Sequence, residues 1–160
     1  MKKKYQISVT LATGICLLAL LIMIAILAFG RPQIVQPFTP PPFDTAAKQG
    51  VPDVPGNLGW QELDAQAFQV GVCGEVFIID NLADIWLTSP ESNAVWLKLR
   101  VLDCNGNILG ETGLIKPGEY VRSVSLNSIP DDPSIVLKVM AYEPETYHSA
   151  GSVNISTKIS

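Results

Sequence analysis

Near its N-terminus the chain contains a long segment that carries no charged side chain. Lys2 to Lys4 precede it, and between residues 7 and 30 the only ionisable group is the thiol of Cys16. A helix of this length would extend about 36 Å, enough to cross a hydrocarbon core of about 30 Å. The segment predicts a transmembrane helix over residues 7–30. It leaves about 130 residues for a linker and one folded domain.

The distribution of basic residues predicts the orientation of this helix. Lys2 to Lys4 lie before the apolar segment, and only Arg31 follows it closely. Because cytoplasmic segments carry the excess of Lys and Arg, residues 1–6 are expected to form a cytoplasmic tip. Residues 31–160 are then expected outside the cell. We predict a single-pass cell membrane protein with an extracellular C-terminal domain and with the membrane itself as one partner.

A cleaved signal peptide is the alternative to a permanent anchor. Ala28 and Gly30 are small residues at the two positions that a signal peptidase reads before a cut after Gly30. The apolar core of a signal peptide spans about 7 to 15 residues, and this segment is longer. Its length favours an uncleaved signal anchor.

The part of the chain after residue 30 is acidic. It contains all fifteen Asp and Glu residues, whereas three of the eleven Lys and Arg residues lie in the N-terminal tip. Negative charge disfavours nucleic acid as a partner. This part also contains Cys73 and Cys104, in a compartment where disulfides are allowed. Because one lies in a predicted strand and the other beside a predicted turn, we expect free thiols, with a bond as the alternative.

Residues 31–65 are expected to form a proline-rich linker. Seven of the twelve prolines lie between residues 32 and 55, where no periodic apolar pattern is present. Proline lacks a backbone donor and favours extended structure, so this segment would hold the following domain away from the membrane. A proline-rich recognition motif is the functional alternative.

From residue 66 onward, short runs of alternating apolar and polar residues are separated by turn residues. This pattern is typical of an all-β domain. It predicts strands at residues 68–72, 75–79, 83–88, 94–103, 108–112, 120–126, 135–142 and 152–159. Seven or eight strands in about 95 residues are typical of an immunoglobulin-like or fibronectin-III-like antiparallel β-sandwich, which we predict for residues 66–160.

Turn chemistry predicts how the central strands pair. Asn105-Gly106 is a strong hairpin signal, and a two-residue loop would place Arg100 opposite Glu111 and Leu102 opposite Leu109. This register sets opposite charges face to face.

A five-residue loop at residues 89–93 would similarly place Trp86 opposite Trp96 and Asp84 opposite Lys98. The alternate positions of these strands would then face the core. They are all apolar: Ile85, Leu87, Val95, Leu97, Leu99 and Val101.

The outward tryptophan pair is the candidate binding surface. It consists of Trp86 and Trp96 with the neighbouring Lys98 and Arg100. Paired rings beside polar groups suit stacking on sugars or an aromatic anchor at a protein interface. An envelope protein or a cell-wall glycan is therefore the expected partner. The alternative is that the rings only stabilise a hairpin, or that a loop, the linker or the segment around Trp60 covers them.

The inventory of catalytic residues is small. His148 is the only histidine, and Glu143 and Glu145 lie in the same predicted loop. No triad, zinc or phosphate-binding motif accompanies them. An envelope hydrolase using this loop is the third hypothesis, after a module with a structural or protein-contact role in the cell envelope and a glycan-binding module. We predict no enzyme and no cofactor.

A calcium loop is imitated near the hairpin turn. Asp103, Asn105 and Asn107 supply oxygens at alternate positions, as the first ligands of such a loop do. Ile108 and Leu114 stand where the loop requires glycine and a bidentate glutamate. A hairpin turn explains the same residues, so no metal site is predicted.

Four segments carry a resemblance to a group of known proteins: residues 96–103, 105–107, 113–120 and 138–144. Their sequences are WLKLRVLD, NGN, GLIKPGEY and KVMAYEP. In this pattern the chain resembles uncharacterised small membrane-anchored envelope proteins of Gram-positive gut bacteria, which carry a C-terminal immunoglobulin-like module. The resemblance implies a fold and a location. It implies no activity and no catalytic residues.

Overall fold

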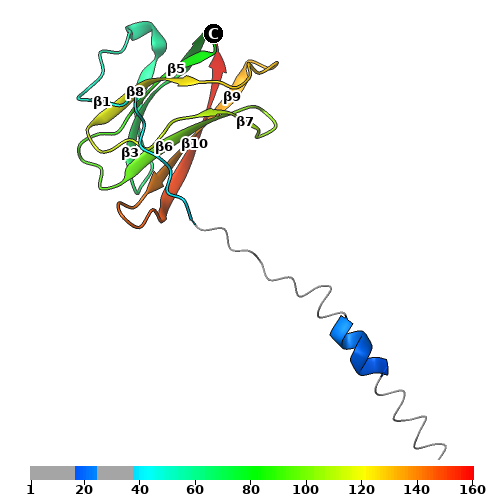
Figure 1. Ribbon diagram of the computed structural model, residues 1–160. Coiled ribbons are helices and arrows are strands. Elements are labelled where there is room, and N and C mark those ends of the chain that lie inside the picture. Colours follow the sequence, from blue (N-terminus) through cyan, green and yellow to red (C-terminus); the bar gives the residue numbers. More distant parts are fainter. Residues whose placement is uncertain (1–16, 25–37) are drawn as a thin grey trace, which may run out of the picture. The chain divides into compact units, whose positions relative to one another are not determined.

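The computed structural model describes residues 17–24 and 38–160 (Figure 1). Residues 17–24 are helical, and Pro40–Ser160 forms a compact unit. None of the helices within the described ranges combines the length and the hydropathy that a membrane crossing requires. The tip at residues 1–6, most of the predicted span at residues 7–30 and the cleavage point after Gly30 lie outside the described residues. Residues 31–37 of the predicted linker also lie outside them.

The unit Pro40–Ser160 is built from strands, which confirms the all-β prediction. The eight strands predicted from the alternating pattern are present, with small shifts at their ends, and two more precede them. A short 3-10 helix, η1 (Gly56–Leu58), lies between the first two strands. The strands are β1 (Lys48–Gln49), β2 (Trp60–Asp64), β3 (Gln69–Cys73), β4 (Glu75–Ile79), β5 (Leu82–Thr88), β6 (Trp96–Leu102), β7 (Ile108–Glu111), β8 (Glu119–Ser125), β9 (Ser134–Tyr142) and β10 (Ser149–Ile159).

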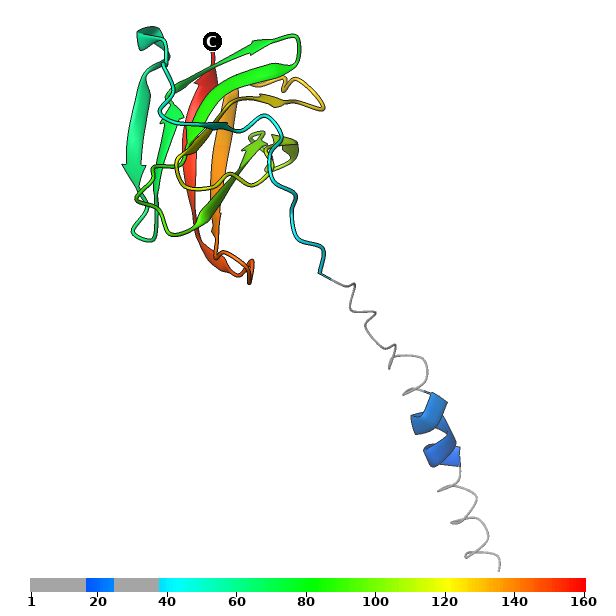
Figure 2. The same ribbon diagram turned by 60° about the vertical axis from the view of Figure 1, so that its left-hand side comes forward.

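The ten strands belong to one curled, mixed sheet. Its first half contains β1, β2, β3, β4, β5 and β8, and its second half contains β6, β7, β9 and β10, with antiparallel pairing inside each half. A short parallel pair between β4 and β10 joins the halves. Figures 1 and 2 show the sheet curling so that β9 and β10, in orange and red, lie across from β5 and β8.

The main hydrophobic core lies between the two halves. Residues of β3 and β5 from the first half and of β6 and β9 from the second half belong to one buried cluster. Burial of these apolar faces is the main force that holds the halves together. The predicted core side is confirmed, because the cluster includes all six expected residues: Ile85, Leu87, Val95, Leu97, Leu99 and Val101.

The folded unit begins earlier than predicted, at Pro40 instead of residue 66. Phe43 pairs with Leu114, β1 pairs with β8, and β2 pairs with β3. Proline is tolerated at sheet edges, and a strand of two residues has no periodicity to detect. The proline content of this region predicts a linker up to residue 65, but the region contains the edge strands β1 and β2.

The hairpin between β6 and β7 confirms one predicted pair and corrects the other. Arg100 faces Glu111 as expected, but Leu102 faces Ile108 because a bulge shifts the register after Val101. The loop is longer than two residues, since the Asp103 backbone N–H donates to the Asn107 carbonyl at 3.0 Å. The extra residue of the bulge is Leu109, which is buried in the main core.

The predicted pairing of β5 with β6 is wrong. Asp84 faces Ser123 of β8, whereas Trp96 faces Tyr142 and Lys98 faces Met140, both in β9. The connection at residues 89–95 crosses from one half of the sheet to the other. As a result, β5 and β6 bury their apolar sides against the same core instead of lying side by side, and the apparent charge match between Asp84 and Lys98 is coincidental.

Candidate binding surfaces on the outer faces of the sheet

Trp86 lies in a bulge of β5. The register between β5 and β8 shifts between Asp84 and Leu87, so that Ile85 and Trp86 together oppose Arg122. Trp86 has a φ of 49°, in the left-handed region that few non-glycine residues adopt. The bulge keeps Ile85 and Leu87 in the core while Trp86 packs in a separate cluster.

This Trp86 cluster is a second, smaller apolar cluster. Its members are Leu58, Cys73 and Trp86, with Val54, Trp60, Phe77 and Tyr120 packed against them. The rings of Trp86 and Tyr120 are stacked, with centroids 6.3 Å apart and an interplanar angle of 17°. Trp86 is only 8% exposed, so most of its ring is already covered.

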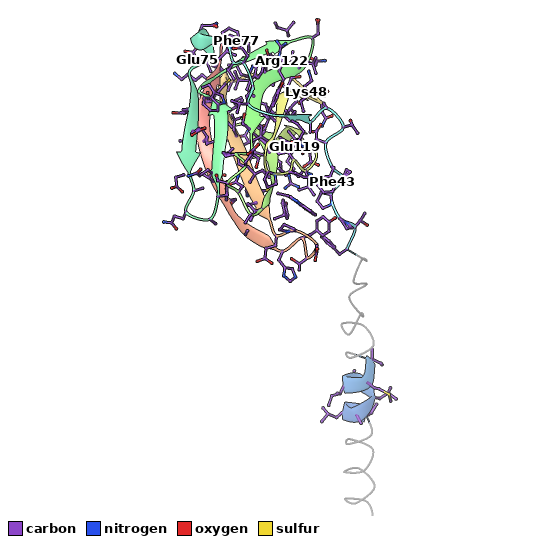
Figure 3. The ribbon with its side chains drawn as sticks, turned by 90° about the vertical axis from the view of Figure 1, so that its left-hand side faces the viewer. Phe43, Lys48, Glu75, Phe77, Glu119 and Arg122 are labelled. Carbon is purple, nitrogen blue, oxygen red and sulfur yellow. The ribbon has the colours of Figure 1, made fainter. Side chains whose placement is uncertain are left out.

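Arg122 and Asp84 form the charged border of the Trp86 cluster. The Arg122 guanidinium lies 5.2 Å from the centroid of the Trp86 ring. Its Nε and Nη2 donate to the Asp84 carboxylate at 3.3 and 3.0 Å, which raises the pKa of Arg122. The Arg122 side chain is 62% exposed, so solvent screens this pair. Figure 3 shows Arg122 nearer to Phe77 and Glu75 than to Phe43.

Cys73 is a structural thiol of the same cluster. It is fully buried and makes no disulfide, and Cys104 is also free but exposed. Burial, with a smaller contribution from the Asp84 charge, raises the pKa of the Cys73 thiol to about 12. The expectation of free thiols is confirmed.

Trp60 is positioned by a glycine on the neighbouring strand. A Cβ atom at Gly71 of β3 would lie 2.9 Å from Cε2 of Trp60 and closer still to Cζ2. The indole of Trp60 therefore occupies the space that a side chain at position 71 would fill. Among the described residues, the indole N–H groups of Trp60 and Trp86 are the buried side-chain polar groups that lack a hydrogen-bond acceptor.

A pocket of about 280 Å³ opens next to Trp60. It is bounded by Trp60 and Glu62 of β2, by residues 88–91 at the end of β5 and in the following turn, and by residues 50, 51 and 118. We call it the acid–aromatic pocket, because an indole and the glutamates Glu62 and Glu91 line it.

Trp96 lies in a different aromatic cluster, called here the Trp96 cluster. Phe43 and Tyr147 contact the Trp96 ring edge-on, with centroids 4.8 and 5.3 Å away. The Lys116 ammonium lies 4.7 Å from the centroid of the Phe43 ring. Trp96 is half-buried, because Phe43 from the N-terminal end of the folded unit and Tyr147 from the turn between β9 and β10 both cover it.

Lys98 and Arg100 share one carboxylate. The Lys98 Nζ donates to Oε1 of Glu111 at 2.8 Å, and the Arg100 Nε donates to Oε2 at 2.9 Å. The Lys98 side chain is only 7% exposed, whereas that of Glu111 is 41% exposed. Partial burial acts to raise the pKa of Glu111, but the hydrogen bonds from Lys98 and Arg100 and their positive charges lower it overall.

The predicted binding surface is therefore divided. Trp96, Lys98 and Arg100 alternate along β6, but Trp86 belongs to the other half of the sheet. Lys98 is a buried charge bound to Glu111 and offers little surface to a partner.

Sequence reasoning missed Phe43, Tyr120 and Arg122, which contact the two tryptophans. The alternative in which the linker or the Trp60 segment covers the rings agrees with these contacts, because Phe43 covers Trp96 and Trp60 packs in the Trp86 cluster. The alternating run WQELD at residues 60–64 was the available signal for the missed strand β2.

The loop with the only histidine connects β9 and β10. Its imidazole Nδ1 lies 4.0 Å from Oε2 of Glu143, and both side chains are exposed. Glu143 also accepts a hydrogen bond from the Thr146 hydroxyl at 3.1 Å. Glu145 has a φ of 65°, as part of the tight turn. The loop is therefore a tight turn in which the Glu143 carboxylate contacts Thr146 and His148.

Asp103 closes the hairpin between β6 and β7. Its carboxylate accepts the backbone N–H groups of Asn105 and Asn107, both at 2.8 Å, and the Asn107 side chain at 2.8 Å. The hydrogen bonds from Asn107 are the main cause that lowers the pKa of Asp103. The Asp103 carboxylate, which would be the first ligand of a calcium loop, is thus used inside the turn. Within the described ranges, no group of three or more His, Cys, Asp or Glu residues could hold a metal ion.

Both outer faces carry groups that a binding surface uses, namely aromatic rings beside charged side chains. Comparison of the chain with protein-family models, curated proteins and solved structures finds no match. The functional inference therefore depends on these residues and on the N-terminal segment.

Proposed function

We propose that this chain is a membrane-anchored surface protein that presents its β domain outside the cell for contact with another envelope protein. The observation that carries the proposal is the uncharged segment at residues 7–30, placed directly after Lys2 to Lys4. Such a segment fits a single-pass anchor with a cytoplasmic N-terminus. The acidic composition of the remaining chain suits a protein contact better than binding to nucleic acid.

We also propose that the folded unit is an immunoglobulin-like β-sandwich. Two groups of antiparallel strands that share one core support this classification. The parallel pair between β4 and β10 would then be a local closure of the two layers along one edge. In this proposal the outer faces with the Trp86 cluster and the Trp96 cluster are the surfaces available to partners.

The attachment of the domain to the anchor supports a display role. The Asp44 N–H donates to the Leu114 carbonyl at 2.8 Å, and the Leu114 N–H donates to the Pro42 carbonyl at 2.9 Å. The Gly113 N–H donates to the Asp44 carboxylate at 2.8 Å. The chain that follows the predicted span is thus bound to the sheet from about Pro42 onward. The remaining linker, residues 31–41, would reach at most about 40 Å when fully extended.

Labelling of Cys104 in intact cells tests the location. Cys104 is exposed, whereas Cys73 is buried with a raised pKa and serves as an internal control. A membrane-impermeant maleimide should label Cys104 from outside, and the Cys104→Ser variant should lose that label. Labelling that requires cell lysis would refute the proposed orientation.

The glycan alternative requires an accessible aromatic face. The expected face of Trp86 and Trp96 does not exist as one surface, because the two residues lie in different halves of the sheet. Crosslinking in intact cells, followed by mass spectrometry, tests the contact role directly. Capture of a specific envelope protein by the wild-type chain is the expected result, and recovery on purified wall glycan without any protein partner would favour the alternative.

A further inference from the structure

We propose that the acid–aromatic pocket binds a cationic side chain, the ammonium of a lysine or the guanidinium of an arginine on a protein partner. The partner part of this proposal rests on the contact function proposed above. The affinity of the pocket for a cation does not rest on that function, because it follows from the groups that line the pocket.

The indole of Trp60 gives the pocket an aromatic wall with a fixed position. Trp60 is held against β3 because Gly71 has no side chain, and the Trp86 cluster packs against it. The face of an indole is the best aromatic surface for a cation. A ring held in place before binding loses little conformational freedom when a ligand arrives.

Two carboxylates complete the pocket. Glu62 follows Trp60 by two residues along β2, so both side chains project from the same side of the strand. Glu91 approaches from the turn after β5, where a Cβ atom at Gly118 would lie 3.1 Å from Cγ of Glu91 and 3.7 Å from its Oε1. The two acidic groups therefore come from segments far apart in the sequence but line one pocket.

Both carboxylates lack a cation of their own within the described part of the chain. The four ion pairs there use Glu111, Asp84 and Glu143, and neither Glu62 nor Glu91 takes part in one. Both glutamates are exposed, so their negative charges are available to attract an approaching cation.

The chemistry of the lining selects the class of ligand. An anionic group would meet two negative charges, and a purely apolar group would leave both carboxylates unused. A cation can contact the indole face and the carboxylates at once. Lysine and arginine side chains also bring an apolar stem that can lie along Val51, which is itself strongly exposed.

Binding of small cationic probes to the full chain in lipid nanodiscs tests the proposal. Isothermal titration at low salt would use Nα-acetyl-lysine methylamide and the corresponding arginine compound. The Nε-acetylated lysine compound serves as a neutral probe of similar shape. We expect both charged probes to bind and the neutral probe to bind at least about fivefold more weakly, a difference that high salt reduces.

Single-charge variants locate the site. Glu62→Gln and Glu91→Gln should each weaken binding of the charged probes by about twofold to fivefold, and the double variant should weaken it further. Glu75→Gln is the matched control, because Glu75 is an exposed strand glutamate outside the pocket lining. Melting curves of all variants confirm that the domain remains folded.

Several results would overturn the proposal. Equal binding of charged and neutral probes, or equal affinity of the pocket variants and the control, would show that the carboxylates do not bind a cation. Binding of N-acetylglucosamine that survives both glutamate substitutions would identify a sugar site instead. These outcomes are separate from the location of the chain, which the labelling of Cys104 tests independently.

Discussion

The substitution Glu111→Gln should destabilise the domain mainly through Lys98. In the wild-type chain the Lys98 ammonium is 2.8 Å from the Glu111 carboxylate, and its side chain is only 7% exposed. A glutamine keeps the size of the side chain but removes the negative charge. Lys98 would then be a buried cation without a countercharge. The exposed contact between Arg100 and Glu111 would also be lost, at a smaller cost.

The size of the loss in the free energy of unfolding depends on how deeply Lys98 and Glu111 are buried. Removing one partner from a fully buried pair costs about 3–5 kcal/mol, and removing an exposed pair costs about 0–1 kcal/mol. Because the Glu111 side chain is 41% exposed and solvent screens it, an intermediate loss of about 1–2 kcal/mol in the free energy of unfolding is expected. In a Lys98→Met background the same substitution should cost below about 0.5 kcal/mol, since only the Arg100 contact remains.

Urea unfolding of the four proteins in this double-mutant cycle, followed by tryptophan fluorescence, measures the coupling. Asp84→Asn is the matched control, because it removes the acidic partner of the exposed cation Arg122 and should cost little. If Glu111→Gln costs the same with Lys98 and with Met at position 98, the ion pair does not stabilise the buried lysine and the reasoning fails.

The pH dependence of the stability of Glu111→Gln, compared with that of the wild type, gives a second test. The pKa of Glu111 is lower in the folded state than its ordinary value of 4.5. A lowered folded-state pKa adds stability that is fully present above the unfolded pKa and is lost as pH falls through the folded one. The stability difference between wild type and Glu111→Gln should therefore be constant near neutral pH and shrink below about pH 4. A difference that persists undiminished in acid would contradict this assignment.

Three further predictions concern packing and thiol chemistry. Gly71→Ala should displace the Trp60 ring and lower the free energy of unfolding by about 1–3 kcal/mol in urea titrations, and an unchanged stability would show that the ring moves freely. Iodoacetamide should modify Cys104 in the folded chain but reach Cys73 only after unfolding, as peptide mass spectrometry would show; rapid modification of both would contradict the burial. Phe43→Ala should remove a ring contact and a cation contact and destabilise the domain by about 1–2 kcal/mol in the same titrations, whereas wild-type stability would mean that this end of the unit is not held by its ring.

Alternation along single strands predicted much of the fold. The residues of β5 and β6 that face the core were identified correctly because side-chain direction depends only on the two-residue period. The partner of each strand depends instead on where a connection leads. Residues 89–95 connect one half of the sheet to the other. No feature of their sequence distinguishes such a connection from a hairpin between neighbouring strands. The pairing of Trp86 with Trp96 failed for this reason, although each strand had been placed well.

The acid–aromatic pocket shows why the candidate site was harder to predict than the strands. Its walls come from β2, from the turn after β5 and from residues 50, 51 and 118, so no local spacing relates them. Trp60 also follows a proline-rich stretch that favours a linker over a strand. One local signal is the alternating run WQELD that begins at Trp60. Gly71 is a second signal, because a glycine inside a strand often marks a place where another part of the chain approaches closely. In the structure the Trp60 ring lies over Gly71 on the adjacent strand, a contact that neither signal specifies by itself.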